Sequence, residues 1–124
     1  MRLSPEEFEE LVDEALESIP PPFEPYMDGL AVDVEPMPDE QTLEEMGIDD
    51  PRSLLGLYRG TPLTARSVEQ SLRMPDSIVI YQRNIERLCR TRQQLVEQIR
   101  KTILHEVGHH FGMDERELGE MGYG

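Results

Sequence analysis

The sequence has few of the residues on which several classes of protein depend. It contains one cysteine, Cys89, which excludes an internal disulfide, fits a reducing compartment and is expected to be a buried structural thiol. No stretch approaches the ~20 consecutive apolar residues of a membrane helix, and the N-terminal sequence MRLSPEEFEELVDEAL lacks the apolar segment of a secretory signal. We therefore expect a cytoplasmic protein without a membrane segment, folded as one small domain over residues 1–124.

Basic residues are also scarce. The chain carries 12 lysines and arginines against 26 acidic residues, for a net charge of −14. This balance argues against a nucleic-acid partner, because phosphate contacts require lysine and arginine. Residues 1–50 hold 17 of the acids and a single base, Arg2. The acidic half is expected to be a solvated face, or to fold over or dimerise with the arginine-rich stretch 83–101. A homodimer is therefore one expectation.

Local patterns predict an α+β fold. A helix is expected to begin at Ser4, where Pro5 and Glu7 complete a strong start signal, and to end before the prolines at 20–22. Alternating or continuous apolar residues predict strands at 30–35, 54–59 and 77–81. Residues 39–53 allow a turn of helix or an acidic loop, and residues 66–73 allow a strand, a hairpin or a loop.

The C-terminal part of the chain reads as helix. From about residue 83, apolar residues recur at spacings of three and four, with Thr91 as the cap of a second, long and largely buried helix. Gly112 stands where such a helix would end in the left-handed conformation. Gly108 lies in mid-helix and predicts either a close approach by another backbone or simple tolerance of glycine.

The last turns of this helix carry the sequence HEVGHHFG. His105 and His109 are four residues apart, so on a helix both imidazoles can reach one tetrahedral metal ion. Glu106 lies between them in sequence, where it can accept a proton from water activated by zinc without being a ligand. The alternative is that the histidines are ordinary core residues at a helix end, because the bare HExxH pattern also arises by chance.

A third zinc ligand is needed, and the sequence offers three candidates. If Gly112 turns the chain sharply, Glu115 can face the metal from the other side. Asp114 is one residue short of that position and can instead cap the following segment. His110 would have to swing in, although a residue one step along a helix points ~100° away; its other potential role is to donate a hydrogen bond to a ligand.

The segment from His105 to the end of the chain, HEVGHHFGMDERELGEMGYG, resembles the zincin metallopeptidases, specifically the Asp-zincin pattern HExxHxxGxxD. It looks most like the small bacterial mini-zincin family, and the resemblance covers about residues 50–124. It implies a twisted sheet of three or four strands packed on helices, with His105, Glu106 and His109 on the active-site helix. The third-ligand position carries over to Glu115, where the sequence departs from the aspartate form. The resemblance also implies that Tyr123 supports the site.

Two functions follow as the main hypotheses. The first is a zinc-dependent metallopeptidase that hydrolyses a peptide or protein substrate with Glu106 as general base, the substrate lying against an exposed strand edge at 66–73 or 77–81. The second is a zincin-like module with little or no activity that acts through metal binding or protein–protein contact, because a second lobe to complete the cleft is not evident. A structural zinc site is less favoured, since Cys89 is isolated.

Overall fold

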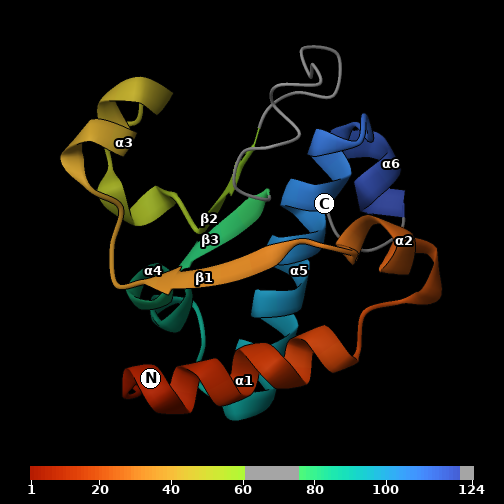
Figure 1. Cartoon of the computed structure of the whole chain (residues 1–124). Helices are drawn as coiled ribbons and strands as arrows, with labels where there is room; N and C mark the ends of the chain where they lie inside the picture. The colour runs from red at the N-terminus through yellow and green to blue at the C-terminus, as the bar shows by residue number, and fades with distance from the viewer. Residues whose placement is uncertain (61–75, 121–124) are drawn as a thin grey trace.

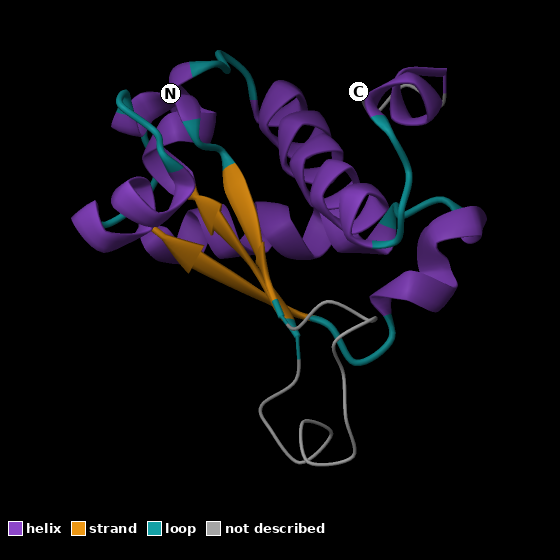
Figure 2. Ribbon diagram, turned by 90° about the horizontal axis from the view of Figure 1, so that it is seen from above, coloured by secondary structure: helices purple, strands orange, loops and turns teal. Residues whose placement is uncertain are grey.

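The computed structural model describes residues 1–60 and 76–120, which form a mixed α+β structure (Figure 1). Two long helices, α1 (Pro5–Glu17) and α5 (Arg92–His110), pack against each other, and α5 also packs against a three-stranded sheet (Figure 2). The α+β fold class predicted from the sequence is confirmed. The predicted segment 66–73 lies outside the described residues.

Helix α1 begins as its sequence predicts. The Ser4 side chain accepts a hydrogen bond from the Glu7 backbone at 3.1 Å, and the Glu7 carboxylate accepts one from the Ser4 backbone at 3.1 Å. These two bonds satisfy backbone donors that the first turn of a helix leaves open. The apolar face of the helix is buried against the core through Phe8, Leu11, Val12 and Ala15.

The sheet has the order β1-β3-β2, formed by β1 (Ala31–Glu35), β2 (Gly56–Arg59) and β3 (Ser77–Tyr81). Strand β1 runs parallel to β3, and β2 runs antiparallel to it. The central place of β3 fits its composition, because a strand covered on both faces reads as a continuous apolar run. The prediction that residues 77–81 offer an exposed edge to a peptide is therefore wrong, since β3 has a neighbour on each side.

The outer edge of β2 borders α5. The Tyr81 backbone donates to the Leu55 carbonyl at 2.9 Å, so in an antiparallel ladder Gly56 and Tyr58 direct their backbone groups away from β3. A Cβ atom on Gly56 would lie 2.8 Å from Cγ2 of Thr102 in α5, so strand and helix are in close contact at this glycine. Among the described residues, the outer edge of β2 thus lies beside the helix that carries the HEVGHH motif.

Shorter helices connect these elements. The proline-rich segment after α1 contains a 3-10 turn at Pro21–Phe23 and the short α2 (Glu24–Met27). The segment 39–53, for which helix and loop were both open, forms α3 (Glu40–Met46) and a 3-10 turn at Pro51–Ser53. Two further helices, α4 (Gln82–Arg87) and α6 (Glu115–Glu120), flank α5 in the chain.

One hydrophobic core joins α5 to the sheet and to α1. Helix α5 contributes a fully buried face, β3 contributes two isoleucines from one side, and α1 contributes its apolar stripe. Full burial of each such side chain stabilises the fold by about 1.5–3 kcal/mol. Cys89 is also buried and forms no disulfide, as predicted. The residues of α5 in this core are Leu95, Ile99, Ile103, Leu104 and Val107.

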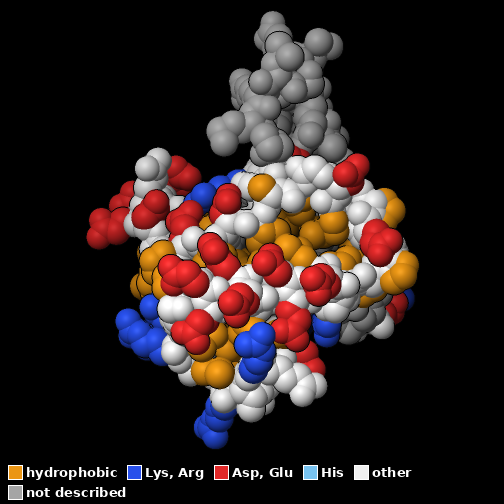
Figure 3. All heavy atoms as spheres, turned by 60° about the horizontal axis from the view of Figure 1, so that its bottom comes forward, with side chains coloured by type: hydrophobic (Ala, Val, Ile, Leu, Met, Phe, Trp, Pro, Cys, Tyr) orange, Lys and Arg blue, Asp and Glu red, His pale blue; other side chains and the backbone are white. Residues whose placement is uncertain are grey.

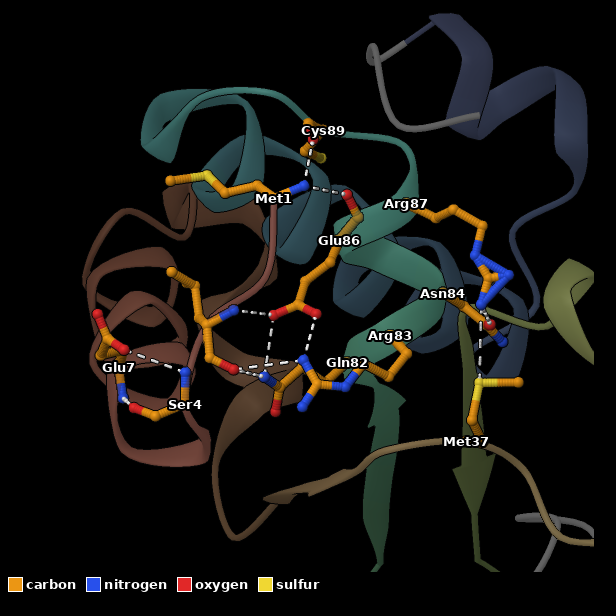
Figure 4. A network of polar contacts seen from close by, with 11 residues as sticks. Met1, Ser4, Glu7, Met37, Gln82, Arg83, Asn84, Glu86, Arg87 and Cys89 are labelled. Atoms are coloured by element: carbon orange, nitrogen blue, oxygen red, sulfur yellow. Dashed lines mark hydrogen bonds and ion pairs between the residues drawn. The ribbon is translucent and has the colours of Figure 1, made fainter.

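A buried carboxylate fixes the start of α1 to α4. Glu86 is 3% exposed and accepts hydrogen bonds from the Leu3 backbone at 2.9 Å, Gln82 Nε2 at 3.0 Å and Arg83 Nη1 at 2.7 Å (Figure 4). Burial opposes ionisation of Glu86, but these donors outweigh it and lower its pKa below the ordinary value. The charged carboxylate therefore holds the N-terminal segment in place against α4.

Acidic side chains spread over the face seen in Figure 3. The acidic helix α1 packs against α5, and Glu14 pairs with Arg92 at 3.2 Å. Both side chains of this pair are more than half exposed, so the pair contributes little to stability. These contacts favour a solvated acidic face that also meets part of the arginine-rich stretch, and a homodimer stays a prediction.

Among the described helices, none is long and apolar enough to cross a membrane.

Candidate metal centre

Helix α5 carries His105 and His109 on one face. Thr91 caps the helix by accepting a hydrogen bond from the Gln94 backbone at 3.1 Å, as predicted. The buried apolar face of α5 then fixes the rotation of the helix, which leaves the histidine side chains partly exposed, at 28% for His105 and 38% for His109. Residues four apart on a helix are neighbours on its surface, and the two Nε2 atoms lie 3.0 Å apart.

The chain reverses direction at Gly112. The Gly112 backbone donates to the His109 carbonyl at 3.1 Å, and the Met113 backbone donates to the Gly108 carbonyl at 2.8 Å. This pair of bonds is a Schellman ending, which requires a left-handed residue after the helix. Gly112 has a φ of 89°, which side chains rarely allow. The left-handed glycine expected from the sequence is present, and the following residues return toward the histidines.

Helix α6 is held against α5 through Gly108. A Cβ atom on Gly108 would lie 2.5 Å from Cδ2 of Leu118, and Leu118 is fully buried. The close approach predicted at Gly108 is therefore made by a side chain and not by another backbone. Asp114 Oδ1 accepts a hydrogen bond from the Glu117 backbone at 2.8 Å, so Asp114 acts as the cap of α6. Glu115 is consequently the first residue of α6, directed toward the histidines.

We expect Gly108→Ala to weaken both the fold and the metal centre. Alanine gains up to ~1 kcal/mol in helix propensity, but displacing the buried Leu118 costs about 1–3 kcal/mol. Because Leu118 positions α6, the change should also move Glu115 and lower zinc affinity. Urea unfolding and zinc titration of the variant measure the two effects.

Gly119→Ala is the matched control for this prediction. Gly119 lies in α6, and a Cβ atom there meets nothing within 4 Å. Alanine at 119 should raise stability slightly and leave zinc affinity unchanged. A Gly108→Ala protein that is more stable than the wild type and binds zinc equally well would show that Leu118 does not position α6.

Three donor atoms converge at the end of α5. Glu115 Oε1 lies 2.8 Å from His109 Nε2 and 3.4 Å from His105 Nε2. Ligand atoms at 2.0–2.2 Å from a tetrahedral zinc ion are about 3.3–3.4 Å apart, so the three separations are close to those a shared ion requires. Two neutral imidazoles and one carboxylate are also the donor set of many catalytic zinc sites. The residues at this position therefore fit a zinc ion.

Glu106 lies beside this group without joining it. Its Oε1 accepts a hydrogen bond from the Tyr58 backbone at 3.3 Å. Burial raises the pKa of Glu106 above its ordinary value, while the Tyr58 bond and the two nearby histidines act in the opposite direction. A carboxylate with a raised pKa is a stronger base, so Glu106 is a candidate proton acceptor beside the candidate metal donors.

Tyr58 also joins a second group of side chains that sequence reasoning missed. Its ring stacks on His110, with centroids 3.9 Å apart, and its hydroxyl donates to Asp76 Oδ2 at 3.0 Å. His110 is not among the candidate metal donors, which fits its place one step along the helix from His109. Its Nε2 lies 4.0 Å from Asp76 Oδ2. No local sequence pattern indicates these contacts, because they join segments far apart in the chain. Tyr123, predicted to support the site, lies outside the described residues.

Comparison with known proteins gives matches to a family profile and to solved structures. A family profile described as zincin-like metallopeptidase matches residues 27–124. The fold is also similar to that of a solved structure, a conserved hypothetical protein from Thermo thermophilus, with 27% sequence identity and a TM-score of 0.54. That similarity covers 94% of this chain and 99% of the other. Among curated proteins, none matches this chain.

Proposed function

Because the chain belongs to the zincin-like metallopeptidase family, we propose that it is a zinc-dependent peptidase in which His105, His109 and Glu115 hold the metal and Glu106 is the general base. One observation carries this proposal. The ligand atoms of the three metal residues lie within 4.8 Å of one another, with Glu106 one residue from His105 and partly buried. Among the described residues three donors, and not four, would hold the metal, which is the number typical of catalytic zinc sites and not of structural ones.

The chain's own residues supply the proton transfers. Zinc, when bound, polarises the scissile carbonyl and makes a water molecule more acidic. Glu106 takes a proton from the attacking water and later delivers it to the leaving amine. Its position near the edge of β2 keeps Glu106 partly out of solvent, which raises its pKa and makes it a stronger proton acceptor. Tyr123 is proposed, from the resemblance to mini-zincins, to support the site by hydrogen bonding.

The substrate is proposed to be a peptide or an unfolded protein segment. The edge that β2 turns away from β3 lies next to Glu106, and an extended peptide can bind beside such an edge through main-chain groups. This location replaces the edge at 77–81 expected from the sequence, whereas the edge expected at 66–73 lies outside the described residues and stays a prediction.

The proposal is tested by metal removal and return. Purified protein that has not met a chelator should contain about one zinc per chain and should cleave a denatured protein substrate. Dialysis against a chelator should abolish cleavage, and stoichiometric zinc should restore it. Bound zinc together with no cleavage across a broad peptide panel would favour the alternative, a zincin-like module that acts through metal binding or protein–protein contact.

A further inference from the structure

A cavity of about 440 Å³ opens directly beside the candidate metal centre. One of its walls is α5, including His105 and Glu106 at one end and Lys101 about one turn away. The opposite wall is the segment 53–56 that leads into β2. Its volume is within the range of pockets that bind small ligands or parts of larger ones. A peptide bond presented to Glu106 would therefore have its neighbouring residues in this cavity.

The cavity combines an apolar wall with one cation. Leu54 and Leu55 are half-buried in the wall, and Leu88, which also lines the cavity, is 61% exposed. An exposed leucine at the margin of a cavity is a surface suited to an apolar part of a ligand. The cation is Lys101, the only lysine of the chain.

Lys101 makes no ion pair among residues 1–60 and 76–120. Glu97, one turn before it on α5, accepts a hydrogen bond from Gln93 and borders a different surface hollow. Lys101 is an exposed residue that lines the cavity, and in a chain with a net charge of −14 its ammonium has no carboxylate partner among the described residues. A carboxylate supplied by a ligand would form an ion pair with the Lys101 ammonium.

The spacing relates this cation to the reacting bond. Lys101 and His105 are four residues apart on α5, so they lie on one face and about 6 Å apart along the helix axis. An extended peptide advances about 3.3 Å per residue. A group held by Lys101 would consequently belong to the first or second residue beyond the bond that faces Glu106.

We propose that this cavity selects peptides that carry a carboxylate one or two residues from the scissile bond, with Lys101 as the residue that determines the preference. The methylene stem or an adjacent apolar side chain lies against Leu54, Leu55 and Leu88, and the carboxylate bonds to the Lys101 ammonium. The carboxylate belongs either to an aspartate or glutamate side chain or to the C-terminus of the peptide. This inference rests on the proposed function for its reacting bond, but it concerns binding and is testable without turnover.

The test measures peptide binding on the Glu106→Gln background, loaded with zinc, so that no peptide is consumed. Short fluorescent peptides with a common leucine-containing core end in glutamate amide, glutamine amide or glutamine with a free carboxyl group. Fluorescence anisotropy gives the Kd of each. We expect at least one carboxylate-bearing peptide to bind about tenfold more tightly than the glutamine amide. Tighter binding of the glutamate amide would show that the carboxylate comes from a side chain, and tighter binding of the peptide with a free carboxyl group would show that it comes from the chain terminus.

Lys101→Gln and Arg100→Gln provide a matched pair. Each removes one positive charge from adjacent positions of α5, but Arg100 bonds to Ser18 of α1 on another face, at 2.9 Å. The ratio of the Kd of the glutamine amide to that of the preferred carboxylate-bearing peptide should fall to about one in Lys101→Gln and stay at the wild-type value in Arg100→Gln. Lys101→Glu should reverse it in favour of peptides that end in lysine amide.

The inference is overturned if Lys101→Gln keeps the preference, if both variants lose it equally, or if no carboxylate-bearing peptide binds better than the amide. Cleavage by the wild type is measured separately on the same peptides. Preferential binding without cleavage would contradict the proposed peptidase activity and leave the cavity assignment standing. Cleavage of the peptides without any binding preference for a carboxylate would contradict the cavity assignment and leave the proposed peptidase activity standing.

Discussion

Glu106→Gln is expected to lower kcat for peptide cleavage by about 10²–10⁴-fold while zinc remains bound, the usual range for loss of a general base. Glutamine has nearly the same shape as glutamate, and its carbonyl oxygen can still accept the hydrogen bond that the Tyr58 backbone donates to Glu106. What it cannot do is accept the proton from water. Steady-state cleavage of a denatured protein, with zinc measured in the same samples, separates these two effects.

Glu117→Gln is the control for this loss. Glu117 is an exposed carboxylate on α6, close to the site in the chain but with no place among the metal donors. The Glu117→Gln protein should cleave the substrate as fast as the wild type does. If Glu106→Gln retained full activity with zinc bound, Glu106 would not be the base, and the carboxylate next to Tyr58 would need another explanation.

Glu115→Ala is expected to weaken zinc binding by more than about 100-fold. Loss of a group that only supports a zinc ligand already costs 10–100-fold in affinity, so the loss of a ligand itself should exceed that range. The prediction rests on the 2.8 Å separation between Glu115 Oε1 and His109 Nε2. Competition with a chromophoric chelator of known affinity measures the change directly.

Asp114→Ala distinguishes the two acidic candidates. Asp114 caps α6 through its bond to the Glu117 backbone, so its loss should lower stability by about 1 kcal/mol and reduce zinc affinity far less than Glu115→Ala. Should Asp114→Ala lose zinc while Glu115→Ala binds as tightly as the wild type, the third ligand would be Asp114. Unfolding curves for both variants check that each protein is folded during the titration.

Features set by neighbouring residues could be predicted from the sequence. The capping box at Ser4, the cap at Thr91 and the left-handed Gly112 each depend on a few adjacent residues, and all three are found. The pairing of His105 with His109 follows from the pitch of a helix alone. The helix α3 was left open because its acidic residues and breakers resemble a loop, although Asp39 and Gly47 mark its two ends.

Features set by distant residues could not be predicted in this way. The bond between the Tyr58 backbone and Glu106 joins positions 48 residues apart. The central place of β3 depends on which strands pair, and its apolar run is equally compatible with several arrangements. A close approach at Gly108, by another backbone, was one of two alternatives predicted from the sequence. Its actual partner, the Leu118 side chain, could not be predicted, since the path of the chain after Gly112 had to be known first.

If zinc binds at the proposed site, the attachment of α6 through Leu118 links zinc binding to the folding of α6. A helix of six residues is far too short to be stable by itself. Helix α6 therefore depends on the packing of Leu118 against Gly108 and on the contact of Glu115 with His109. An ion shared by α5 and α6 would tie the two helices together, and its binding energy would add to the free energy that keeps the tail docked. Zinc occupancy and folding of α6 would then form one coupled equilibrium, in which the free zinc concentration sets the fraction of molecules with α6 docked.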